Sequence, residues 1–219
     1  MKAGQIKLLV FDWDGTLADS AALIVDAMQS AIRQLQYQSR SKVQICDVIG
    51  LGLVEAAQVL FPEMERENHE LISNSYRLHY AQRAHETSLF PGVTDTLHLL
   101  RQREYKMAIA TGKSRKGLDN SLQQTGLAGF FHTTRCADET CSKPHPQMLY
   151  EILDELDIRP EQAVMIGDSE FDMEMAQHAG MQSIAVSYGV HDRERLVHYK
   201  PLFCLNSLGE LPDCLPAPR

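Results

Sequence analysis

Two carboxylates, Asp12 and Asp14, are the first residues in the chain whose types and spacing could do chemistry. They follow residues 8–11, a continuously apolar run typical of a parallel strand buried on both faces. Side chains two residues apart on extended backbone project to the same side, so both carboxylates should face one small volume. At about 4 Å and an effective dielectric constant near 20, their repulsion would be about 4 kcal/mol. Either one carboxyl is therefore protonated or a cation lies nearby.

Two later apolar runs also end in polar residues. These are Thr111, Gly112 and Lys113 after a predicted strand at 106–110, and Asp168 and Asp172 after a predicted strand at 163–166. In an open parallel sheet, ligands bind at the carboxyl ends of the strands. We therefore expect these residues to converge with the first two carboxylates. The hydroxyl of Thr111 and the amide of Gly112 are neutral donors of the kind that hold phosphate oxygens.

A group of carboxylates at one sheet edge favours a hard, oxygen-coordinated cation. Mg²⁺ best explains Asp168 in this position, because it uses few carboxylates and keeps sites for water and phosphate. Asp172 in isolation is better explained as an acid favourably placed near a helix N-terminus. Lys113 and Lys143 are the candidate counter-cations, although a single lysine in a loop is usually a solvated charge.

Strands and helices alternate through most of the chain, which predicts an α/β fold: a parallel sheet with helices on both faces. Helical patterns cover 93–103, 115–124 and 147–156, and another follows residue 169. Further strands are expected at 130–133 and 183–186. The Pro-rich end, 212–219, is expected to be a loose tail.

Residues 17–88 contain helical patterns only, with Asp19 or Ser20 as the expected cap of the first helix. A strand-to-helix connection is normally much shorter, so this segment should be an inserted helical cap domain on a core of 1–16 and 89–219. The segments 17–20 and 86–90 are the expected hinges. The glycines of Gly50-Leu51-Gly52 permit close approach, and we expect this loop to reach into the site.

Composition narrows the class of protein. The 219 residues carry a formal charge of -8, which argues against nucleic-acid binding because no basic surface is available to neutralise phosphates. No signal peptide or membrane span is expected from the short N-terminal apolar run. The five cysteines lack paired metal-ligand spacing and should be reduced thiols in a cytoplasmic protein. The oligomeric state is undetermined by the sequence.

At this point the motifs resemble those of the haloacid dehalogenase superfamily, in its branch with a helical cap. The matching segments are Asp12-Trp13-Asp14-Gly15-Thr16, Thr111 with Gly112-Lys113, Lys143, and Gly167-Asp168 with Asp172. The segments Leu17-Ala18-Asp19-Ser20 and Phe90-Pro91-Gly92-Val93 look most like those of phosphoglycolate-phosphatase-type members. The resemblance implies a Rossmann-like core and a Mg²⁺-dependent phosphatase acting on a small phosphomonoester, such as phosphoglycolate or a sugar phosphate. Gly112 is a departure, because related phosphatases often have Asn there.

The resemblance also implies a role for each residue. Asp12 would be the nucleophile that forms an aspartyl-phosphate, and Asp14 the general acid and base. Asp12, Asp168 and the backbone carbonyl of Asp14 would bind Mg²⁺. The substrate phosphoryl group would be held by Thr111, Gly112, Lys113 and Lys143, with Thr111 and Lys143 also assisting catalysis. Asp172 would support Lys143 or the waters of the metal.

Two alternatives stay open from the sequence. A phosphosugar mutase of the same cap class also keeps both aspartates of the first motif, and it would retain the phosphoryl group until a sugar hydroxyl accepts it. A phospho-accepting protein that binds Mg²⁺ without turnover is the non-enzymatic alternative. A dehalogenase is disfavoured by Asp14, because a halide leaving group needs no proton.

Overall fold

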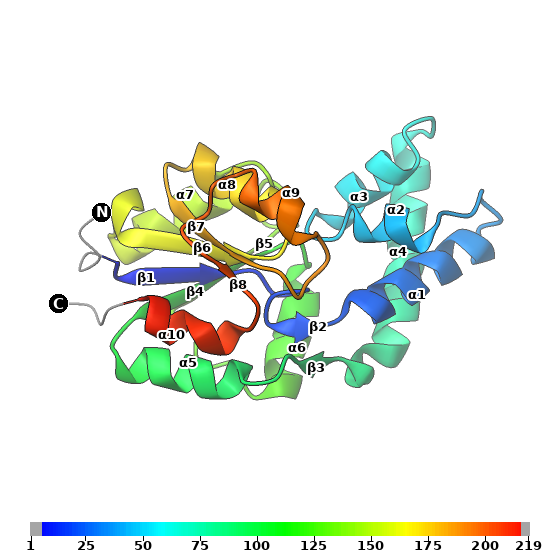
Figure 1. The fold of residues 1–219 in the computed structure, drawn as a ribbon. Helices are drawn as coiled ribbons and strands as arrows, with labels where there is room; N and C mark the ends of the chain where they lie inside the picture. The colour runs from blue at the N-terminus through cyan, green and yellow to red at the C-terminus, as the bar shows by residue number, and fades with distance from the viewer. Residues whose placement is uncertain (1–5, 216–219) are drawn as a thin grey trace.

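A six-stranded parallel sheet forms the centre of the computed structural model, which describes residues 6–215 (Figure 1). In order across the sheet, the strands are β5 (Thr133–Cys136), β4 (Lys106–Thr111), β1 (Leu8–Phe11), β6 (Ala163–Gly167), β7 (Gln182–Val186) and β8 (Cys204–Leu205). Val10 of β1 lies beside Ala108 of β4 on one side and Met165 of β6 on the other. The first strand is therefore central, and its carboxyl end lies where the chain changes direction across the sheet.

Helices cover both faces of this sheet. They are α5 (Val93–Gln102), α6 (Arg115–Thr125) and α10 (Leu211–Cys214) on one face, and α7 (Gln147–Leu156) and α8 (Glu170–His178) on the other. Side chains of β1 alternate between two hydrophobic clusters, with Leu9 and Phe11 in the first and Leu8 and Val10 in the second. Both faces of the strand are buried, which explains why its sequence is apolar without alternation.

Between β2 (Ala18–Asp19) and β3 (Ser88–Leu89), the chain leaves the sheet and forms four helices. These are α1 (Ala21–Gln34), α2 (Lys42–Cys46), α3 (Leu53–Leu60) and α4 (Arg66–Arg83), followed by a 3₁₀ turn at Ala84–Glu86. They share a hydrophobic cluster that includes Met28, Ile32, Phe61 and Ile72. Figure 1 shows these helices beyond the carboxyl end of β1. We call these four helices the helical insertion. That residues 17–88 form a separate domain stays a prediction.

The expected hinge segments lie side by side, because β2 and β3 pair as a two-stranded antiparallel sheet. The amide of Phe90 also donates to the carbonyl of Leu17, at 3.0 Å. This pairing was not predicted, because two residues per strand are too few to show any periodicity. The remaining short elements also pack on the core. The helix α9 (Arg193–Val197) contacts α8, β7 and β8, and 3₁₀ turns at Pro160–Gln162 and Leu208–Glu210 contact β6 and α5 respectively.

The strand predicted at 130–133 is wrong by three residues, since β5 covers Thr133–Cys136. The aromatic residues that suggested a strand instead pack on the core. Phe131 lies edge-on to Phe11, with ring centroids 6.4 Å apart, and Phe130 packs against His98 and Arg101. Tertiary packing of these rings therefore outweighs their strand propensity.

The loose tail predicted from Pro212 onwards is also wrong for residues 212–215. Pro212 lies buried in α10, and the guanidinium of Arg103 donates to the carbonyls of Pro212 and Leu215. Residues 216–219 lie outside the described part of the chain. The cysteines are free thiols, as expected, and within residues 6–215 no helix is both long and apolar enough to cross a membrane.

Candidate active site

Asp12 lies directly after β1, and its amide donates to the carbonyl of Ile166 in β6, at 2.9 Å. One carboxylate oxygen, Oδ1, accepts a hydrogen bond from the amide of Trp13 at 2.6 Å and lies 2.8 Å from Nζ of Lys143. The other, Oδ2, is buried and has no hydrogen-bond partner among the described residues. A buried oxygen without a donor is costly unless a ligand or cation meets it, so Oδ2 is the atom that the fold leaves available for chemistry.

Lys143 is fully buried and lies between two carboxylates. Its Nζ is 2.8 Å from Asp12 Oδ1 and 2.7 Å from Asp172 Oδ1. Burial alone would lower the pKa of Lys143, but the two carboxylates raise it above its ordinary value. Asp172 is itself fixed, because its Oδ2 accepts from the amide and hydroxyl of Ser169, at 3.1 and 2.6 Å. This arrangement holds a permanent cation beside the free oxygen of Asp12.

Three buried carboxylates face one another at the ends of β1 and β6. Oxygen atoms of Asp12, Asp168 and Asp172 lie within 4.8 Å of one another. Burial, together with the neighbouring carboxylates, raises the pKa of Asp12 well above its ordinary value and the pKa of Asp168 to about 7. One lysine cannot neutralise three carboxylates. The donor set therefore fits a hard divalent cation such as Mg²⁺.

Asp168 is held by its neighbours so that its carboxylate faces this cluster. It accepts from the hydroxyl of Thr16 at 2.7 Å and from the amide of Val190 at 2.9 Å. A Cβ at Gly15 or Gly189 would lie 2.1 or 2.2 Å from atoms of Asp168, so any other residue there would displace the carboxylate. Gly15 also has a φ of +84°, a left-handed conformation that favours glycine.

The carboxylate of Asp14 lies outside this cluster and faces the helical insertion. Nζ of Lys113 is 3.0 Å from its Oδ1, and the hydroxyl of Ser20 donates to the same oxygen at 2.6 Å. Lys113 also donates to the hydroxyl of Tyr80 in α4, at 3.2 Å. Burial would lower the pKa of Lys113, but Asp14 and Tyr80 raise it. Asp12, Asp14 and Asp168 were the three predicted metal-binding residues. The structure brings the side chains of Asp12 and Asp168 together, whereas Asp14 could bind a metal only through its backbone carbonyl, as predicted.

Two residues near Asp14 were not recognised in the sequence. Ser20 was predicted as a possible helix cap, but its hydroxyl makes no capping hydrogen bond and donates to Asp14 instead. Tyr80 is one of many polar residues on a surface helix, and no local pattern marks it as close to Lys113. Only its contact across the interface between the insertion and the core identifies it.

The loop Gly50-Leu51-Gly52 does reach the site, as predicted, and lines a cavity with Asp12 and Asp14. The amide of Gly52 donates to the hydroxyl of Ser142, the neighbour of Lys143, at 2.7 Å. A Cβ at Gly112 would lie 2.3 Å from the carbonyl oxygen of Leu51. The departure at Gly112 therefore has a physical reason, since its missing side chain leaves room for this loop. Thr111 lies beside it, fully buried, and lines the same cavity.

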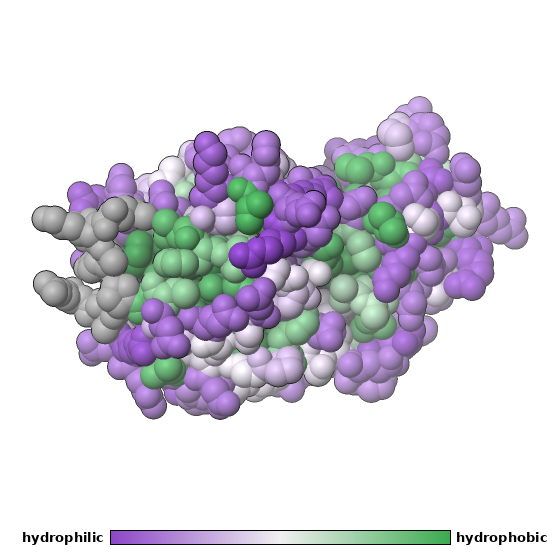
Figure 2. Space-filling view, viewed as in Figure 1, coloured by the Kyte–Doolittle hydropathy of each residue, from purple (hydrophilic) through white to green (hydrophobic). Residues whose placement is uncertain are grey.

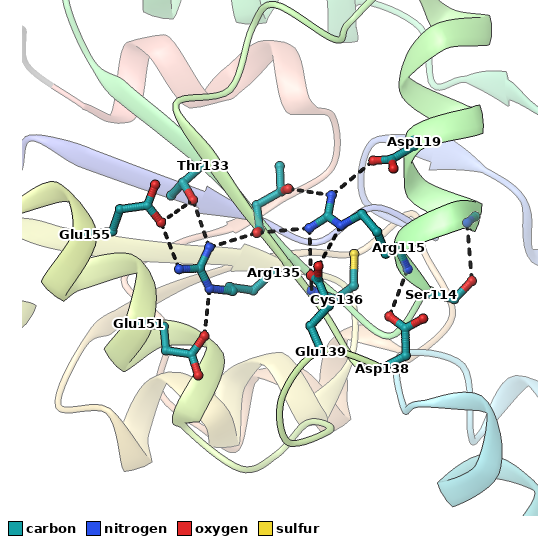
Figure 3. Close-up of polar contacts among 12 residues, drawn as sticks. Ser114, Arg115, Asp119, Thr133, Arg135, Cys136, Asp138, Glu139, Glu151 and Glu155 are labelled. Carbon is teal, nitrogen blue, oxygen red and sulfur yellow. Dashed lines mark hydrogen bonds and ion pairs between the residues drawn. The ribbon is translucent and has the colours of Figure 1, made fainter.

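Two arginines form ion pairs with residues on either side of Lys143 (Figure 3). Arg115, just after the Thr111-Gly112-Lys113 segment, pairs with Glu139 at 2.7 Å, and its amide donates to Asp138. Arg135 of β5 pairs with Glu151 and Glu155 of α7. The end of β4 and the loop carrying the buried lysine are therefore held in one rigid arrangement.

The family model that describes haloacid dehalogenase-like hydrolases matches residues 9–186. The chain belongs to this family. The phosphoglycolate phosphatase of Vibrio cholerae is 32% identical to this hydrolase over 216 residues, covering 94% of this chain and 96% of the relative. A pyrophosphatase, PpaX of Bacillus cereus, is 30% identical over 212 residues, covering 94% of this chain and 95% of the relative.

Solved structures show the same fold. A putative haloacid dehalogenase-like hydrolase from Bacteroides fragilis superposes with a TM-score of 0.85 at 27% identity, over 94% of this chain and 99% of that one. A hydrolase from Pseudomonas syringae superposes with a TM-score of 0.87 at 22% identity, over 94% of this chain and 96% of that chain. At 22% identity, that second likeness is evidence for the fold alone.

Replacing Gly112 should displace the loop that reaches the site. We expect Gly112→Ala to push the Leu51 carbonyl away and to break the hydrogen bond from Gly52 to Ser142, worth about 0.5–1.5 kcal/mol. Hydrogen exchange of the Gly52 amide should then be about 2- to 13-fold faster, as those energies imply. Gly129→Ala is the matched control, because a Cβ there meets nothing within 4 Å. Unchanged exchange at Gly52 in Gly112→Ala would show that the loop does not depend on this space.

Mg²⁺ should stabilise the hydrolase through the carboxylate cluster. At 100 times its Kd, a ligand of the folded state adds about 2.7 kcal/mol of stability, which corresponds to a rise in Tm of about 5–10 °C at this chain length. Asp168→Asn should lose most of that rise and, in EDTA, should be at least as stable as the wild type, because one of three buried carboxylates is gone. Thermal unfolding with and without Mg²⁺ tests this, with the exposed Asp154→Asn as control. An equal Mg²⁺-induced rise in Asp168→Asn would contradict the assignment.

Proposed function

We propose that this hydrolase is a Mg²⁺-dependent phosphatase that cleaves a small phosphomonoester through an aspartyl-phosphate on Asp12. The observation that carries the proposal is the free Oδ2 of Asp12, a buried carboxylate oxygen without a donor beside a permanently charged lysine. The names of its relatives, phosphoglycolate phosphatase and pyrophosphatase, support transfer of a phosphoryl group to water. A cytoplasmic location is part of the same proposal.

In the first step, Oδ2 of Asp12 attacks phosphorus, and the bond from phosphorus to the ester oxygen breaks. The carboxyl of Asp14 gives its proton to that leaving oxygen, so the alcohol departs neutral. The ammonium of Lys143, the hydroxyl of Thr111 and the amide of Gly112 stabilise the charge on the phosphoryl oxygens. Lys113, which pairs with Asp14, is placed to hold Asp14 and the substrate together.

In the second step, the carboxylate of Asp14 takes a proton from a water molecule, which attacks the same phosphorus atom and releases phosphate. Asp12 is thereby restored. Asp12, Asp168 and the carbonyl of Asp14 would hold Mg²⁺, which when bound reduces the repulsion between the carboxylate nucleophile and the phosphate anion. Asp172 acts through Lys143, which it keeps charged and fixed.

Phosphate release over a panel of esters tests the proposal. Phosphoglycolate, sugar phosphates and nucleoside monophosphates should be tried with Mg²⁺ and with EDTA, using Asp12→Asn as the blank. We expect Mg²⁺-dependent release that falls to background in Asp12→Asn, because the nucleophile is lost. A stable phosphoryl group on Asp12 that only a sugar hydroxyl removes would instead identify a mutase. Phosphorylation of Asp12 without any turnover would identify a phospho-accepting protein.

Asp14 should matter differently for good and poor leaving groups. p-Nitrophenolate departs without a proton, whereas an alkoxide needs one, and loss of a general acid or base costs about 10²- to 10⁴-fold in rate. In Asp14→Asn we therefore expect a burst of about one p-nitrophenolate per site followed by slow turnover, and no burst of alcohol from an alkyl phosphate. Rapid-mix kinetics measures both, with the exposed neighbour variant Asp19→Asn as control. Equal loss of the first step for both esters would count against Asp14 as the acid.

A further inference from the structure

The cavity beside Asp12 and Asp14 has a volume of about 510 Å³, and most of the residues that line it from the helical insertion are apolar. The apolar side chains in this wall include Ile24, Met28, Ile45, Ile49, Leu51 and Leu53. The rings of Tyr76 and Tyr80 stack beside them, with centroids 5.6 Å apart. By contrast, the periphery of the molecule in Figure 2 is mostly hydrophilic, while hydrophobic residues are visible across the middle of the core. A cavity of this size accommodates a ligand much larger than phosphoglycolate, whose organic part has only two carbons.

Apart from Lys113, the lining residues within the described part of the chain offer no buried cation for a second anionic group. Lys113 is paired with Asp14. Arg66 pairs with Glu70, Arg77 donates to the side chain of Asn74, and both arginines are exposed, as is Lys116. The lining also includes Glu55, which is exposed like the two arginines. An anionic group in the inner part of the cavity would be desolvated without a cationic partner.

We propose that the alcohol portion of the substrate is neutral and largely apolar, and that it packs against the wall formed by Leu51, Leu53, Tyr76 and Tyr80. The inference rests on the proposed phosphatase function and names the class of ester that the site takes. Tyr76 and Tyr80 add aromatic surface to this wall, where a ring or alkyl chain can pack beside them. The ammonium of Lys113 lies 4.6 Å from the centroid of the Tyr80 ring. The hydroxyl of Tyr80, which accepts from Lys113, can also donate to a hydroxyl or carbonyl oxygen of the substrate.

A matched pair of alkyl phosphates tests the charge preference. Benzyl phosphate and 4-carboxybenzyl phosphate have similar leaving groups and differ in one carboxylate; phosphoglycolate is the small anionic reference. We expect kcat/KM for benzyl phosphate to be at least ten-fold higher than for either anionic ester. The p-nitrophenyl phosphate reaction, with Asp12→Asn as blank, reports separately on whether the site hydrolyses phosphomonoesters.

A charge placed in the cavity wall should reverse the preference. Leu53, the first residue of α3, lines the cavity, whereas Val59 of the same helix is 59% exposed and does not line it. In Leu53→Lys we expect the ratio of kcat/KM for 4-carboxybenzyl phosphate over benzyl phosphate to rise at least ten-fold. Val59→Lys should leave that ratio unchanged. Thermal unfolding of both variants verifies that they are folded before the ratios are compared.

The outcomes separate the inference from the function on which it rests. The inference would be overturned if the protein hydrolysed all the esters but kcat/KM for phosphoglycolate or 4-carboxybenzyl phosphate equalled or exceeded that for benzyl phosphate. The phosphatase function would then still stand. An unchanged ratio in a folded Leu53→Lys would likewise overturn the placement of the alcohol portion. No Mg²⁺-dependent release from any ester, p-nitrophenyl phosphate included, would overturn the phosphatase function and the inference with it.

Discussion

The buried ion pair network of Lys143 with Asp12 and Asp172 is the constraint on which the rest of the site depends. Burying one ammonium and two carboxylates is costly, and the cost is offset only where geometry and additional hydrogen bonds are good. Here the distances are 2.8 and 2.7 Å, and Ser169 satisfies the second oxygen of Asp172. Such a network needs rigid surroundings, which the parallel sheet and the pairings of Arg115 and Arg135 provide. Asp168 then adds a third buried carboxyl group, so the site holds more carboxyls than its one lysine can neutralise.

A second set of contacts joins the helical insertion to this rigid core. Lys113 donates a hydrogen bond to the hydroxyl of Tyr80, and the amide of Gly52 donates to the hydroxyl of Ser142. Lys113 also pairs with Asp14, and Ser142 precedes Lys143, so both contacts lie beside residues of the proposed mechanism. Further out, Arg195 of α9 lies 2.9 Å from Asp47 at the end of α2. Asp14, the proposed general acid, is therefore held partly by groups whose position depends on the helical insertion. This couples the position of the insertion to the chemistry of Asp14, because Asp14 and Tyr80 share the same ammonium.

Most of the core fold could be predicted from the sequence, because buried strands and amphipathic helices have strong periodic patterns. The strand at 106–110 and the helix at 147–156 lie within a residue of the observed elements. The prediction at 130–133 failed because Phe130 and Phe131 serve side-chain packing and not the strand. The pair β2 and β3 and the short β8 have two residues each, too few for any periodicity to appear. Their pairing depends on segments far apart in the chain.

The sequence by itself determined which strand ends carry polar residues, and the rule that carboxyl ends of parallel strands share one edge was enough to group Asp12, Thr111 and Asp168. It could not determine which oxygen of Asp12 is free, that Ser20 serves Asp14, or that Gly112 leaves room for Leu51. These were decided only by the tertiary structure. Strand and helix patterns arise from neighbours along the chain, whereas contacts across the cavity join distant residues: Lys113 and Asp14 are 99 positions apart, and Gly112 and Leu51 are 61 apart. Ser20 is only six residues from Asp14, but its hydrogen bond follows no strand or helix period.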